Sequence, residues 1–460
     1  MSNSTSKQTS DWLNNYANVT VVGLGLTGCS VVEYLLRHDV VISVQDTRPK
    51  PPYLAAVEQL AAAKGKVIHS SLGALDKQAM LSSDLIVVSP GLSVKTPELQ
   101  AARDAGVEMI GDIDMLTRSV TAPIIAITGS NGKSTVTTLV GEMCKAAGMN
   151  AFVGGNIGRP ALEMLSAGEH YDVAVLELSS FQLETTKRLQ ATACVILNIS
   201  QDHLDRYASM VDYMKAKLRI FLGAEYAVVN RNDTMLEQVL PSVKSSTTFG
   251  LGRPASDLDY GLLTDQKGID FLAKGSRKIM PVDAVPLVGS HNIANILASI
   301  ALVEPLSLPE SAVVQAIGQF KGLPHRMQTV RKLNGVTWIN DSKATNVGAC
   351  QAAIAGIDGG VVLLAGGQGK GGDFAQLLPV LQSKVKHVIL FGEDAPLLND
   401  LWSGAVACEL VSSLPEAVHK ASELARQRDC VLLSPACASF DMFDSFEHRG
   451  EQFKQLVEAL

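Results

Sequence analysis

The sequence lacks the features that direct a chain to a membrane or to nucleic acid. No apolar run reaches the roughly 18 to 20 residues of a membrane-spanning helix, and the opening stretch MSNSTSKQTSDWLNNYANVT has no apolar signal-peptide core. The 46 acidic residues outnumber the 39 basic ones, so the net charge of −7 creates no positive field for nucleic acid or an anionic membrane. We therefore expect a cytoplasmic protein without nucleic-acid binding or membrane insertion. No long apolar surface pattern indicates a partner chain, so a monomer is expected.

Cysteines are few and show no spacing typical of a zinc site or a redox-active pair. The chain has seven, mostly within apolar segments: Cys29, Cys144, Cys194, Cys350, Cys408, Cys430 and Cys437. We expect them to be reduced residues of the core. Cys437 alone falls in a loop that carries other candidate functional residues.

What the chain has instead is an alternation of short apolar runs with amphipathic stretches. Runs such as PIIAITGS, DVAVLELSS and GVVLLAGG are each followed by a turn and a helical pattern, which is typical of parallel sheets covered by helices on both faces. The length of 460 residues suggests about three domains. We predict an α/β protein with domains at residues 1–110, 111–322 and 323–460 and a polar β insertion near residues 254–285.

The first domain opens on VTVVGLGLTGCSVVEYLL, residues 19–36, which indicates a strand, a glycine loop and a helix. Gly23, Gly25 and Gly28 follow the G-x-G-x-x-G order of a dinucleotide-binding turn, and Asp46 lies near the distance of the acidic residue that binds a ribose. The pattern predicts a Rossmann-like fold with a diphosphate at the helix N-terminus. Taken alone, it would favour a nicotinamide-dependent oxidoreductase.

A second glycine loop, in APIIAITGSNGKSTVTTLVG, changes that interpretation. Its backbone N–H groups can converge on phosphates, Lys133 supplies a positive charge, and Ser134 supplies a hydroxyl for Mg²⁺. The spacing departs from G-x-x-x-x-G-K-[ST], because Ile127 occupies the first glycine position and Gly129 lies nearer. The residues expected to bind ATP here are Gly129, Ser130, Asn131, Gly132, Lys133, Ser134 and Thr135. An oxidoreductase needs no second phosphate loop, whereas an enzyme that uses ATP on another phosphorylated substrate needs both.

A carboxylate completes this pattern in the second domain. Glu177 ends the apolar strand of DVAVLEL, where its side chain would project from the sheet edge toward the phosphate loop. Because Mg²⁺ prefers oxygen ligands, Glu177 and Ser134 are candidate metal ligands.

The loop T-G-S-N-G-K-S resembles that of the Mur ligases of peptidoglycan synthesis and of their relatives, the folylpolyglutamate synthases. Further segments resemble family motifs in the family's order: GGNIGRPAL, LELSSFQLE, NISQDHLDRY, YMKAKLRIF, GSHNIANILAS, GLPHRMQ, NDSKATN and LLSPACASFDMFDSFEHRGEQF. Together with GLGLTG and DTRP, they most resemble the motifs of the members that join D-glutamate to UDP-N-acetylmuramoyl-L-alanine. Folate enzymes lack a comparable first domain, so the opening glycine turn argues against them.

This resemblance implies an ATP-dependent ligase that uses two Mg²⁺ ions. ATP would phosphorylate a carboxylate of UDP-N-acetylmuramoyl-L-alanine, and the amine of D-glutamate would displace phosphate through a tetrahedral intermediate. The implied fold has a Rossmann-like N-terminal domain, a central P-loop ATPase domain with a parallel sheet, and a C-terminal Rossmann-like α/β domain.

The resemblance also implies roles in catalysis and metal binding within the central domain. His203 would bind the second Mg²⁺. Lys217 of KAKLR would carry a carbamate formed with CO₂, an anionic group that would support magnesium alongside Ser134 and Glu177. Lys215, two residues away, would point elsewhere on the same helix. The residues implied as catalytic are Lys133, His203 and Lys217.

The remaining implied roles concern the substrates. Asn295, Arg326 and Asp341 would complete the ATP site, the last two from the third domain, so that nucleotide binding would draw domains two and three together. The UDP-substrate would contact Gly25, Leu26, Thr27, Thr47, Arg48, Gly91 and Asn156. The pocket for D-glutamate would be formed by Lys343, Thr345, Ser439, Phe440 and Phe446.

The glycine-rich stretch LLAGGQGKGGDF has neither the order nor the residues of a second nucleotide loop. It lacks G-K-[ST], and Gln368 stands where Mur ligases often carry an acidic residue. We therefore expect a loop at a domain interface, and the resemblance implies Lys370 as a ligand-binding residue.

Three other functions remain open from the residues alone. A Mur ligase that adds a different amino acid would differ in which amino acid supports phosphate release. A NAD-dependent oxidoreductase with a regulatory phosphate loop would bind NADH at the first glycine turn. A nucleotide-dependent interaction module would leave the candidate metal ligands without a chemical role.

Overall fold

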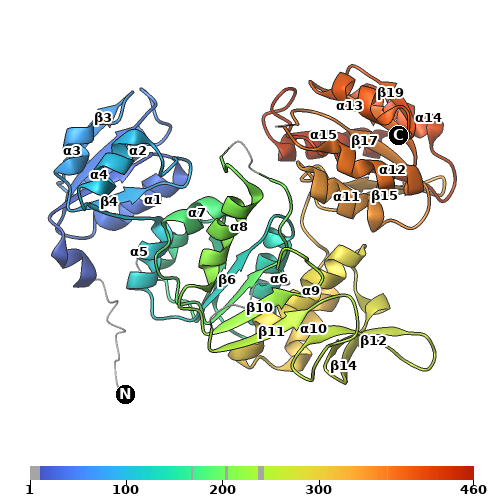
Figure 1. Cartoon of the computed structure of the whole chain (residues 1–460), viewed down its shortest axis with the longest axis horizontal. Coiled ribbons are helices and arrows are strands. Elements are labelled where there is room, and N and C mark those ends of the chain that lie inside the picture. The colour runs from blue at the N-terminus through green and yellow to red at the C-terminus, as the bar shows by residue number, and fades with distance from the viewer. Residues whose placement is uncertain (1–10, 167–168, 203–205, 237–242, 370) are drawn as a thin grey trace.

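The computed structural model describes residues 11–166, 169–202, 206–236, 243–369 and 371–460. In this part of the chain the strands form three sheets, drawn from consecutive stretches of the sequence. Figure 1 shows the first sheet at one end of the molecule, the second in the middle and the third at the other end. The three-domain α/β architecture predicted from the sequence is confirmed.

The N-terminal domain has a parallel sheet of order β3-β2-β1-β4-β5 with helices on both faces. Its elements are η1 (Asp11–Asn15), β1 (Asn18–Val22), α1 (Leu26–Leu35), β2 (Val41–Asp46), α2 (Leu54–Ala63), β3 (Ile68–Leu72), α3 (Lys77–Leu81), β4 (Leu85–Val88), α4 (Pro97–Asp104) and β5 (Glu108–Ile110). β4 is apolar and buried along its whole length, β1 is buried from its second residue onward, and both lie in the interior of the sheet order, where both faces are covered. The helix α5 (Asp112–Ser119) then leads into the central domain.

The central domain has a sheet of order β14-β13-β12-β11-β10-β9-β6-β8-β7. Its first elements are β6 (Ile124–Thr128), α6 (Lys133–Ala146), β7 (Ala151–Gly155), η2 (Ala161–Leu165), β8 (Val173–Glu177), α7 (Ser180–Thr185), β9 (Ala193–Ile196), α8 (Met210–Leu218), η3 (Arg219–Phe221), β10 (Tyr226–Asn230) and β11 (Ser245–Phe249). They are followed by β12 (Tyr260–Thr264), β13 (Asp270–Lys274), β14 (Arg277–Pro281), η4 (Val282–Ala284), α9 (Ser290–Leu302), η5 (Glu304–Leu306) and α10 (Glu310–Gln319). The antiparallel β12, β13 and β14 extend the parallel part, which confirms the β insertion.

The C-terminal domain has a sheet of order β15-β16-β20-β17-β18-β19, parallel except for the β15 and β16 pair. Its elements are β15 (Gln328–Leu333), β16 (Val336–Asn340), α11 (Val347–Ala355), β17 (Val361–Ala365), η6 (Phe374–Leu377), α12 (Leu378–Lys384), β18 (Val385–Leu390), α13 (Ala395–Trp402), β19 (Ala407–Leu410), α14 (Leu414–Leu424), β20 (Cys430–Leu433) and α15 (Phe446–Ala459). Side chains cap the helices that border the site: Asn346 accepts from the backbone of α11 and Ser445 from that of α15.

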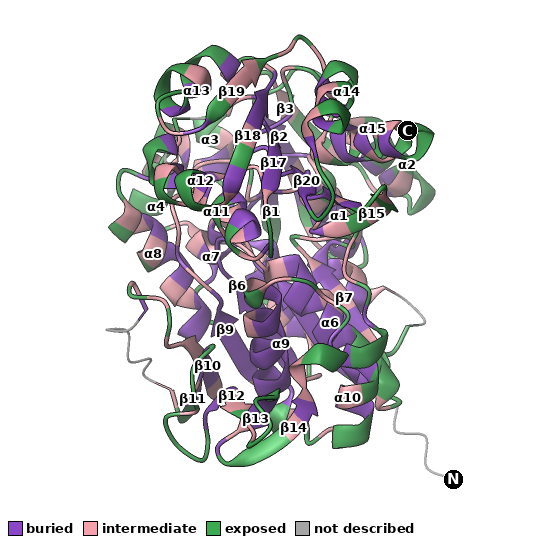
Figure 2. Ribbon diagram, turned by 90° about the vertical axis from the view of Figure 1, so that its right-hand side faces the viewer, coloured by how far each residue is buried: buried purple, intermediate pink, exposed green. Residues whose placement is uncertain are grey.

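Burial follows the apolar pattern of the sequence. The strands β6, β8 and β17 are buried at every position. In Figure 2 the central strands and the helices α6 and α9 are largely buried, whereas α10 and α14 present exposed outer faces. None of the helices in the described residues is long and apolar enough to cross a membrane.

The cysteines agree with their predicted state. All seven are free, five of them are buried, and Cys29 and Cys408 are half-buried. Burial raises the pKa values of Cys194 and Cys437 above the usual range, so these thiols stay protonated and poorly reactive.

Candidate active site

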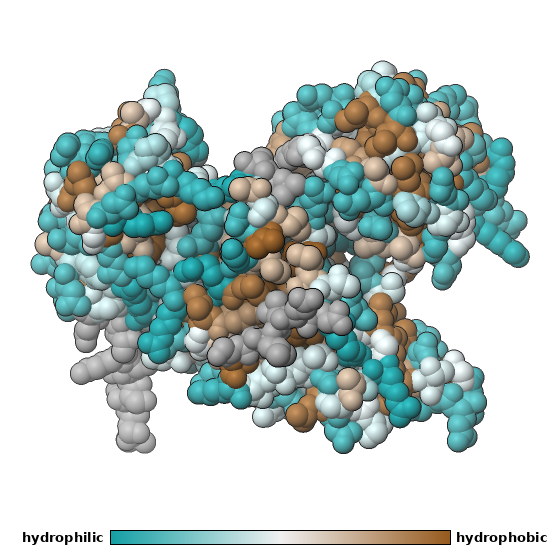
Figure 3. All heavy atoms as spheres, viewed as in Figure 1, coloured by the Kyte–Doolittle hydropathy of each residue, from teal (hydrophilic) through white to brown (hydrophobic). Residues whose placement is uncertain are grey.

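A cavity with a volume of about 910 Å³ lies between the central and C-terminal domains and is referred to below as the larger cavity. Figure 3 shows the surface hollowed between these two parts of the molecule. Its lining brings together a large share of the residues predicted from the sequence: Ser130, Asn131, Gly132, Lys133, Ser134, Asn156, Glu177, Lys217, Arg326, Lys343, Thr345 and Phe446. Residues predicted to bind phosphate, metal and amino acid therefore face one shared space.

The phosphate loop joins the buried strand β6 to the N-terminus of α6. Gly132 precedes the helix with a φ of 84°, in the left-handed region that favours glycine. A Cβ atom at Gly132 would lie 2.5 Å from Oδ1 of Asn295, so only glycine fits between this loop and α9. Lys133 begins the helix, and its Nζ donates to the carbonyl oxygens of Gly129 at 3.0 Å and Ser130 at 2.9 Å. The loop thus holds a lysine and free helix N–H groups at one edge of the cavity.

Lys217 reaches the same loop from α8. Its side chain is 1% exposed, and Nζ donates to the carbonyl oxygen of Gly129 at 2.9 Å and to Oγ1 of Thr128 at 3.2 Å. Burial, and next the positive charge of Lys133, lower the pKa of Lys217 well below its usual value. Lys215 on the same helix is exposed, so of the two lysines only Lys217 lines the cavity.

Glu177 ends β8 at the edge of the cavity and is buried. Its Oε1 accepts a hydrogen bond from Nδ2 of Asn156 at 2.9 Å, whereas its Oε2 is buried without a hydrogen-bond partner among the described residues. A buried carboxylate oxygen without a partner is costly unless a cation or a donor arrives. With the hydroxyl of Ser134 nearby in the lining, the donor atoms are hard oxygens and fit Mg²⁺.

The remaining predicted metal ligand is the histidine expected to bind the second Mg²⁺. His203 lies outside the described residues, as does Lys370. Among the described residues no group of three or more His, Cys, Asp or Glu side chains is arranged to hold a metal ion. Of the four residues predicted to support magnesium, Ser134, Glu177 and Lys217 line the larger cavity.

A second cavity of about 370 Å³ lies against the other side of the phosphate loop. It is bounded by Thr135 of α6 and Asn295 of α9 in the central domain, and by Asp341 and the helix α11 in the C-terminal domain. Asn131, Gly132, Arg326 and Lys343 line both cavities. The two cavities therefore meet at the phosphate loop and share residues from both domains.

Arg326 connects the C-terminal domain to the phosphate loop. Its Nη2 donates to Oγ of Ser134 at 2.6 Å. The residues on either side have left-handed backbones, with φ values of 61° at His325 and 45° at Met327, an unusual conformation that turns Arg326 toward the central domain. Burial raises the pKa of Asp341 to about 7, although a hydrogen bond from the hydroxyl of Ser434 opposes the shift.

The predicted amino-acid pocket is only partly assembled in the larger cavity. Nζ of Lys343 lies 3.8 Å from the ring centre of Phe446, and Thr345 completes this corner. Burial, and next the charge of Arg326, lower the pKa of Lys343 to about 8. Ser439 is buried and the side chain of Phe440 is 63% exposed, and neither is among the described residues that line either cavity.

The predicted UDP-binding residues form a separate group on the N-terminal domain. Gly23 has a φ of 92°, and a Cβ atom at Gly28 would lie 2.0 Å from the carbonyl oxygen of Gly23, so the turn requires glycine at both positions. Asp46 accepts from the backbone N–H of Leu24 at 2.7 Å and from the side chain of Arg48. The residues of this group that line neither cavity are Gly25, Leu26, Thr27, Thr47, Arg48 and Gly91.

Asp46 therefore connects the two halves of the predicted UDP site. Partial burial would raise its pKa, but hydrogen bonds from Arg48 and Leu24 hold the pKa of Asp46 at about 2. A carboxylate occupied in this way organises the turn and the arginine, and both of its oxygens already accept hydrogen bonds from them.

Comparisons with known proteins cover all three domains. Residues 17–111 match the Mur ligase MurD-like N-terminal domain, residues 127–303 the Mur ligase middle domain, and residues 325–437 the Mur ligase glutamate ligase domain. Proteins named UDP-N-acetylmuramoylalanine--D-glutamate ligase are 46% identical in Hahella chejuensis and 48% identical in Methylobacillus flagellatus. These alignments cover 96% of this chain and 98% and 97% of the two relatives. The chain belongs to the Mur ligase family.

Solved structures give the same fold at much lower identity. A pseudomurein peptide ligase type C from Methanothermus fervidus superposes with a TM-score of 0.60 at 18% identity, over 96% of this chain and 99% of that chain. MurF from Acinetobacter baumannii superposes with a TM-score of 0.59 at 16% identity, over 95% of this chain and 93% of that chain. These similarities support the shared three-domain α/β architecture.

The structure adds cavity residues that the sequence interpretation of this Mur ligase missed. Tyr213 lines the larger cavity, and its hydroxyl lies 3.1 Å from Oγ of Ser130. The spacing of Tyr213 and Lys217 on α8 puts both on one helix face, so helical periodicity could have identified the pair. Asn346 donates to Oδ1 of Asn131 at 3.3 Å across the domain boundary, a contact for which the sequence contains no local signal.

Proposed function

We propose that this Mur ligase joins D-glutamate to UDP-N-acetylmuramoyl-L-alanine while ATP is converted to ADP and phosphate, a step in peptidoglycan precursor synthesis. The observation that carries the proposal is the single cavity in which the phosphate loop of the central domain faces Lys343, Thr345 and Phe446 of the C-terminal domain. Sequence identity of 46% to 48% over nearly the whole chain to proteins named for this reaction supports the choice of substrates.

The reaction has to bring together two anions that repel each other, the γ-phosphate of ATP and the substrate carboxylate. Transfer of the phosphoryl group to the carboxylate would give an acyl phosphate. Attack by the D-glutamate amine would then form a tetrahedral intermediate, from which phosphate leaves. Lys133, Arg326 and the N-terminus of α6 line the cavity with positive charge, which would stabilise the charge that develops in both steps.

Magnesium would be held by Ser134 and Glu177, with His203 proposed for a second ion. When bound, Mg²⁺ would supply charge neutralisation for the phosphate oxygens. The unpartnered Oε2 of Glu177 supports this role, because it is a buried acceptor without a donor from the described residues, and Glu177 lines the same cavity as the phosphate loop.

We further propose that Lys217 carries a carbamate. A neutral amine is the form that attacks CO₂, releasing one proton as the N–C bond forms, and burial favours the neutral form of Lys217. The modified side chain would be anionic and would lie beside Gly129 and the cationic Lys133. Lys217→Ala should reduce turnover by about 10²-fold or more, with partial rescue by short carboxylic acids. Rescue would not be seen if the unmodified amine were the active form.

The lysine and aromatic pair of the C-terminal domain is proposed as the D-glutamate pocket. Lys343 would bind the side-chain carboxylate of the amino acid, and Phe446 would bound the cavity. Ser439 and Phe440 stay in this proposal as residues that would join the pocket when substrate is bound.

On the N-terminal domain, the diphosphate of the UDP-sugar would lie at the N-terminus of α1. Gly25, Leu26 and Thr27 begin this helix, and Thr47 and Arg48 follow β2. We propose domain limits of 1–110, 111–322 and 323–460, a cytoplasmic location and a monomeric state.

Phosphate release with a panel of amino acids tests the proposal. The assay would contain ATP, Mg²⁺ and UDP-N-acetylmuramoyl-L-alanine, with D-glutamate, L-glutamate, L-alanine or diaminopimelate. Release should require D-glutamate. Release that favours another member of the panel would assign a different amino acid, and release that ignores the amino acid would contradict the ligase function.

A further inference from the structure

Arg206 joins the N-terminal domain to the central domain at a point between the two proposed substrate sites. Its Nη1 donates to the carbonyl oxygen of Pro90 at 3.0 Å, and its Nη2 donates to the carbonyl oxygen of Leu92 at 2.8 Å. Nη2 also pairs with Oε2 of Glu184 at 3.0 Å, and the guanidinium carbon lies 4.2 Å from the ring centre of Phe181. The arginine side chain is only 13% exposed. One face of the guanidinium therefore packs against an aromatic ring and both terminal nitrogens donate hydrogen bonds, whereas Nε is buried without a hydrogen-bond partner among the described residues.

On the N-terminal side, the loop that Arg206 binds supports the glycine turn. Oγ of Ser89 donates to the carbonyl oxygen of Gly23 at 2.6 Å, and the N–H of Leu92 donates to the carbonyl oxygen of Ser89 at 3.1 Å. A Cβ atom at Gly23 would lie 2.9 Å from Cβ of Ser89 and 3.0 Å from Cδ1 of Leu92. A displacement of this loop therefore displaces the turn proposed to hold the diphosphate.

On the central side, both partners of Arg206 belong to α7. Phe181 lines the larger cavity, and Glu184 lies one turn further along the same helix. The helix begins three residues after Glu177, and a capping box between Ser179 and Gln182 fixes its start. Arg206 thus contacts the helix α7, which begins directly after Glu177, the proposed metal-binding residue.

We propose that Arg206 is a positioning residue that sets the separation between the UDP-binding turn and the cavity where phosphoryl transfer takes place. The inference rests on the proposed function and extends it to a residue outside both sites. A guanidinium is a rigid planar fork whose donors are held apart in fixed directions, so it can fix the two carbonyl oxygens and the carboxylate in one geometry, whereas the donors of an ammonium group all leave a single nitrogen atom. Because phosphoryl transfer depends on the alignment of bound groups, a small loop displacement would misplace the substrate carboxylate.

Other contacts keep the two domains together when Arg206 is changed. Nη1 of Arg37 donates to the carbonyl oxygen of Leu165 at 2.5 Å, and the hydroxyl of Tyr34 and the indole of Trp12 both contact Ser119. Arg37 is therefore a matched control: it is also an arginine that binds a backbone carbonyl across this boundary, but it does not contact the loop at residues 89–92.

Steady-state kinetics on Arg206→Met and Arg37→Met test the proposal. Arg206→Met should raise the KM for UDP-N-acetylmuramoyl-L-alanine about tenfold and lower kcat about tenfold, while the KM for ATP changes less than about twofold. Arg37→Met should leave the three constants within about twofold of the wild type. Arg206→Lys, which keeps the charge and the aliphatic stem but not the planar fork, should fall between the wild type and Arg206→Met.

Equal increases in the KM for ATP and for the UDP-substrate in Arg206→Met would overturn the positioning role, as would the same response in Arg37→Met. If Arg206→Met fails to fold, Arg206→Lys alone decides, because wild-type kinetics in that variant would show that the fork is not needed.

Hydrogen–deuterium exchange separates this inference from the proposed function. The backbone amides of residues 89–96 should exchange faster in Arg206→Met than in wild type, and at the wild-type rate in Arg37→Met. If wild type releases no phosphate with the UDP-substrate, the proposed function fails and exchange still tests the contact. Unchanged exchange at residues 89–96 in an active enzyme would refute the role of Arg206 alone.

Discussion

The N-terminal domain is joined to the central domain in a different way from the C-terminal domain. One cluster of buried apolar residues runs without interruption from Val21 and Tyr34 of the N-terminal domain through Leu116 of α5 to Leu176 in the central sheet. Among the described residues, the clusters on the other side of the central sheet and in the C-terminal domain stay within 125–320 and 327–457. The first boundary is therefore part of a core, and the second is not.

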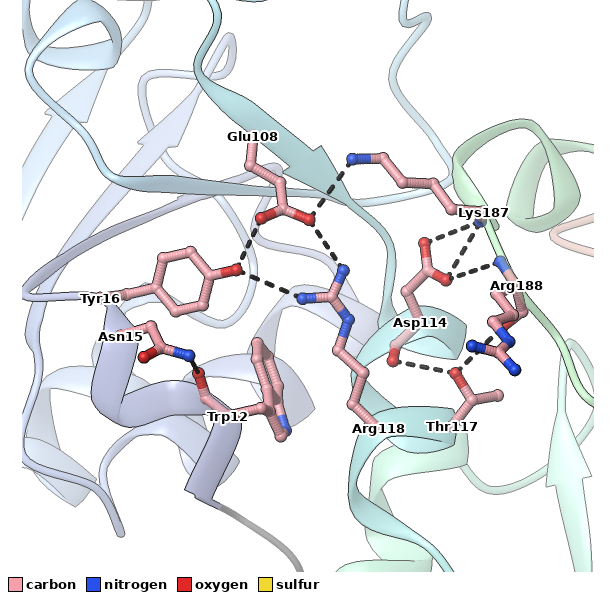
Figure 4. A network of polar contacts seen from close by, with 9 residues as sticks. All are labelled: Trp12, Asn15, Tyr16, Glu108, Asp114, Thr117, Arg118, Lys187 and Arg188. Atoms are coloured by element: carbon pink, nitrogen blue, oxygen red, sulfur yellow. Dashed lines mark hydrogen bonds and ion pairs between the residues drawn. The ribbon is translucent and has the colours of Figure 1, made fainter.

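The polar contacts also distinguish the two boundaries: those at the first involve an ion-pair network, and those at the second involve residues that line the larger cavity. At the first, Glu108 accepts from the hydroxyl of Tyr16 at 2.6 Å and pairs with Arg118 at 2.8 Å and Lys187 at 3.4 Å, as Figure 4 shows. At the second, the contacts between side chains include Arg326 with Ser134 and Asn346 with Asn131, and all four residues line the larger cavity.

This difference indicates that the first boundary is complete without substrate, whereas the second consists largely of the residues that would bind it. An apolar core shared between two domains makes them unfold as one cooperative unit. A boundary made of ligand-binding groups gains contacts when ligand arrives, so ATP should strengthen the attachment of the C-terminal domain. Changes at the two boundaries should therefore affect different properties of the protein.

Arg326→Ala should give the largest effect, and it should act on activity alone. The substitution removes the guanidinium that reaches from the C-terminal domain to Ser134 of the phosphate loop. We expect kcat to fall about 10³-fold, with a melting temperature within about 2 °C of wild type. Arg118→Ala at the other boundary is the control and should keep most of the activity. Comparable losses of activity in both variants would contradict the distinction between the boundaries.

Leu116→Ala should act mainly on stability. Leu116 is fully buried in the core shared by the N-terminal and central domains, so the cavity left by truncation should cost about 2 to 5 kcal/mol of unfolding free energy. Differential scanning calorimetry should show a lower transition for these two domains together, with the transition of the C-terminal domain unchanged. Leu381→Ala, in the core of the C-terminal domain, should give the opposite pattern. Separate transitions for the N-terminal and central domains would show that the shared core does not couple them.

Asp112→Asn should stabilise the first boundary above pH 6. Burial raises the pKa of Asp112 to about 6, although a hydrogen bond from Gln182 opposes this shift, and its Oδ1 has no partner among the described residues. The folded state therefore holds a proton that the unfolded chain loses near pH 4, so stability falls as the pH rises from about 4 to 6. Removing the charge should gain on the order of 2 kcal/mol at pH 7.

The pH dependence is the sharper measurement for Asp112→Asn. Chemical denaturation between pH 4 and pH 7 should show a smaller loss of unfolding free energy with rising pH than in wild type. An unchanged slope would mean that another group titrates in this range. Asp112 and its partner Gln182 lie at the boundary between the N-terminal and central domains. The unfolding transition of the C-terminal domain should therefore not change with this substitution.

The parts of the site that could be predicted from the sequence are those with a local physical signal. Gly23 and Gly132 adopt backbone conformations that other residues rarely adopt, and each stands in a strand–glycine–helix pattern. Glu177 could be placed because an apolar strand that ends in a carboxylate puts that carboxylate at the end of the sheet, where the phosphate loop also begins. The burial of Lys217 could also have been predicted, because helical periodicity puts it on the same helix face as Tyr213.

The parts that could not be predicted depend on contacts between distant segments. Nothing near Arg206 in the sequence indicates that it binds the backbone at Pro90, and nothing near Arg326 indicates its bond to Ser134. Ser439 and Phe440 were expected together in one pocket, but adjacent residues in a loop can face in different directions, and here one is buried and the other exposed. The role of His203 stays a prediction, since it lies outside the described residues.

Glu108→Gln should give the smallest effect. It measures how much the ion pairs contribute to the stability of the first boundary, compared with the shared apolar core. Partial burial would raise the pKa of Glu108, but the hydroxyl of Tyr16 and the charge of Arg118 hold it at about 2. The carboxylate therefore contributes stability above pH 4.5 that is lost as the pH falls toward 2. Its side chain is partly exposed and its pairs are screened by salt, so the loss at pH 7 should be below about 1 kcal/mol and should shrink further in 1 M salt. A loss as large as that of Leu116→Ala would mean that the ion pairs of Figure 4, rather than the shared apolar core, hold the two domains together.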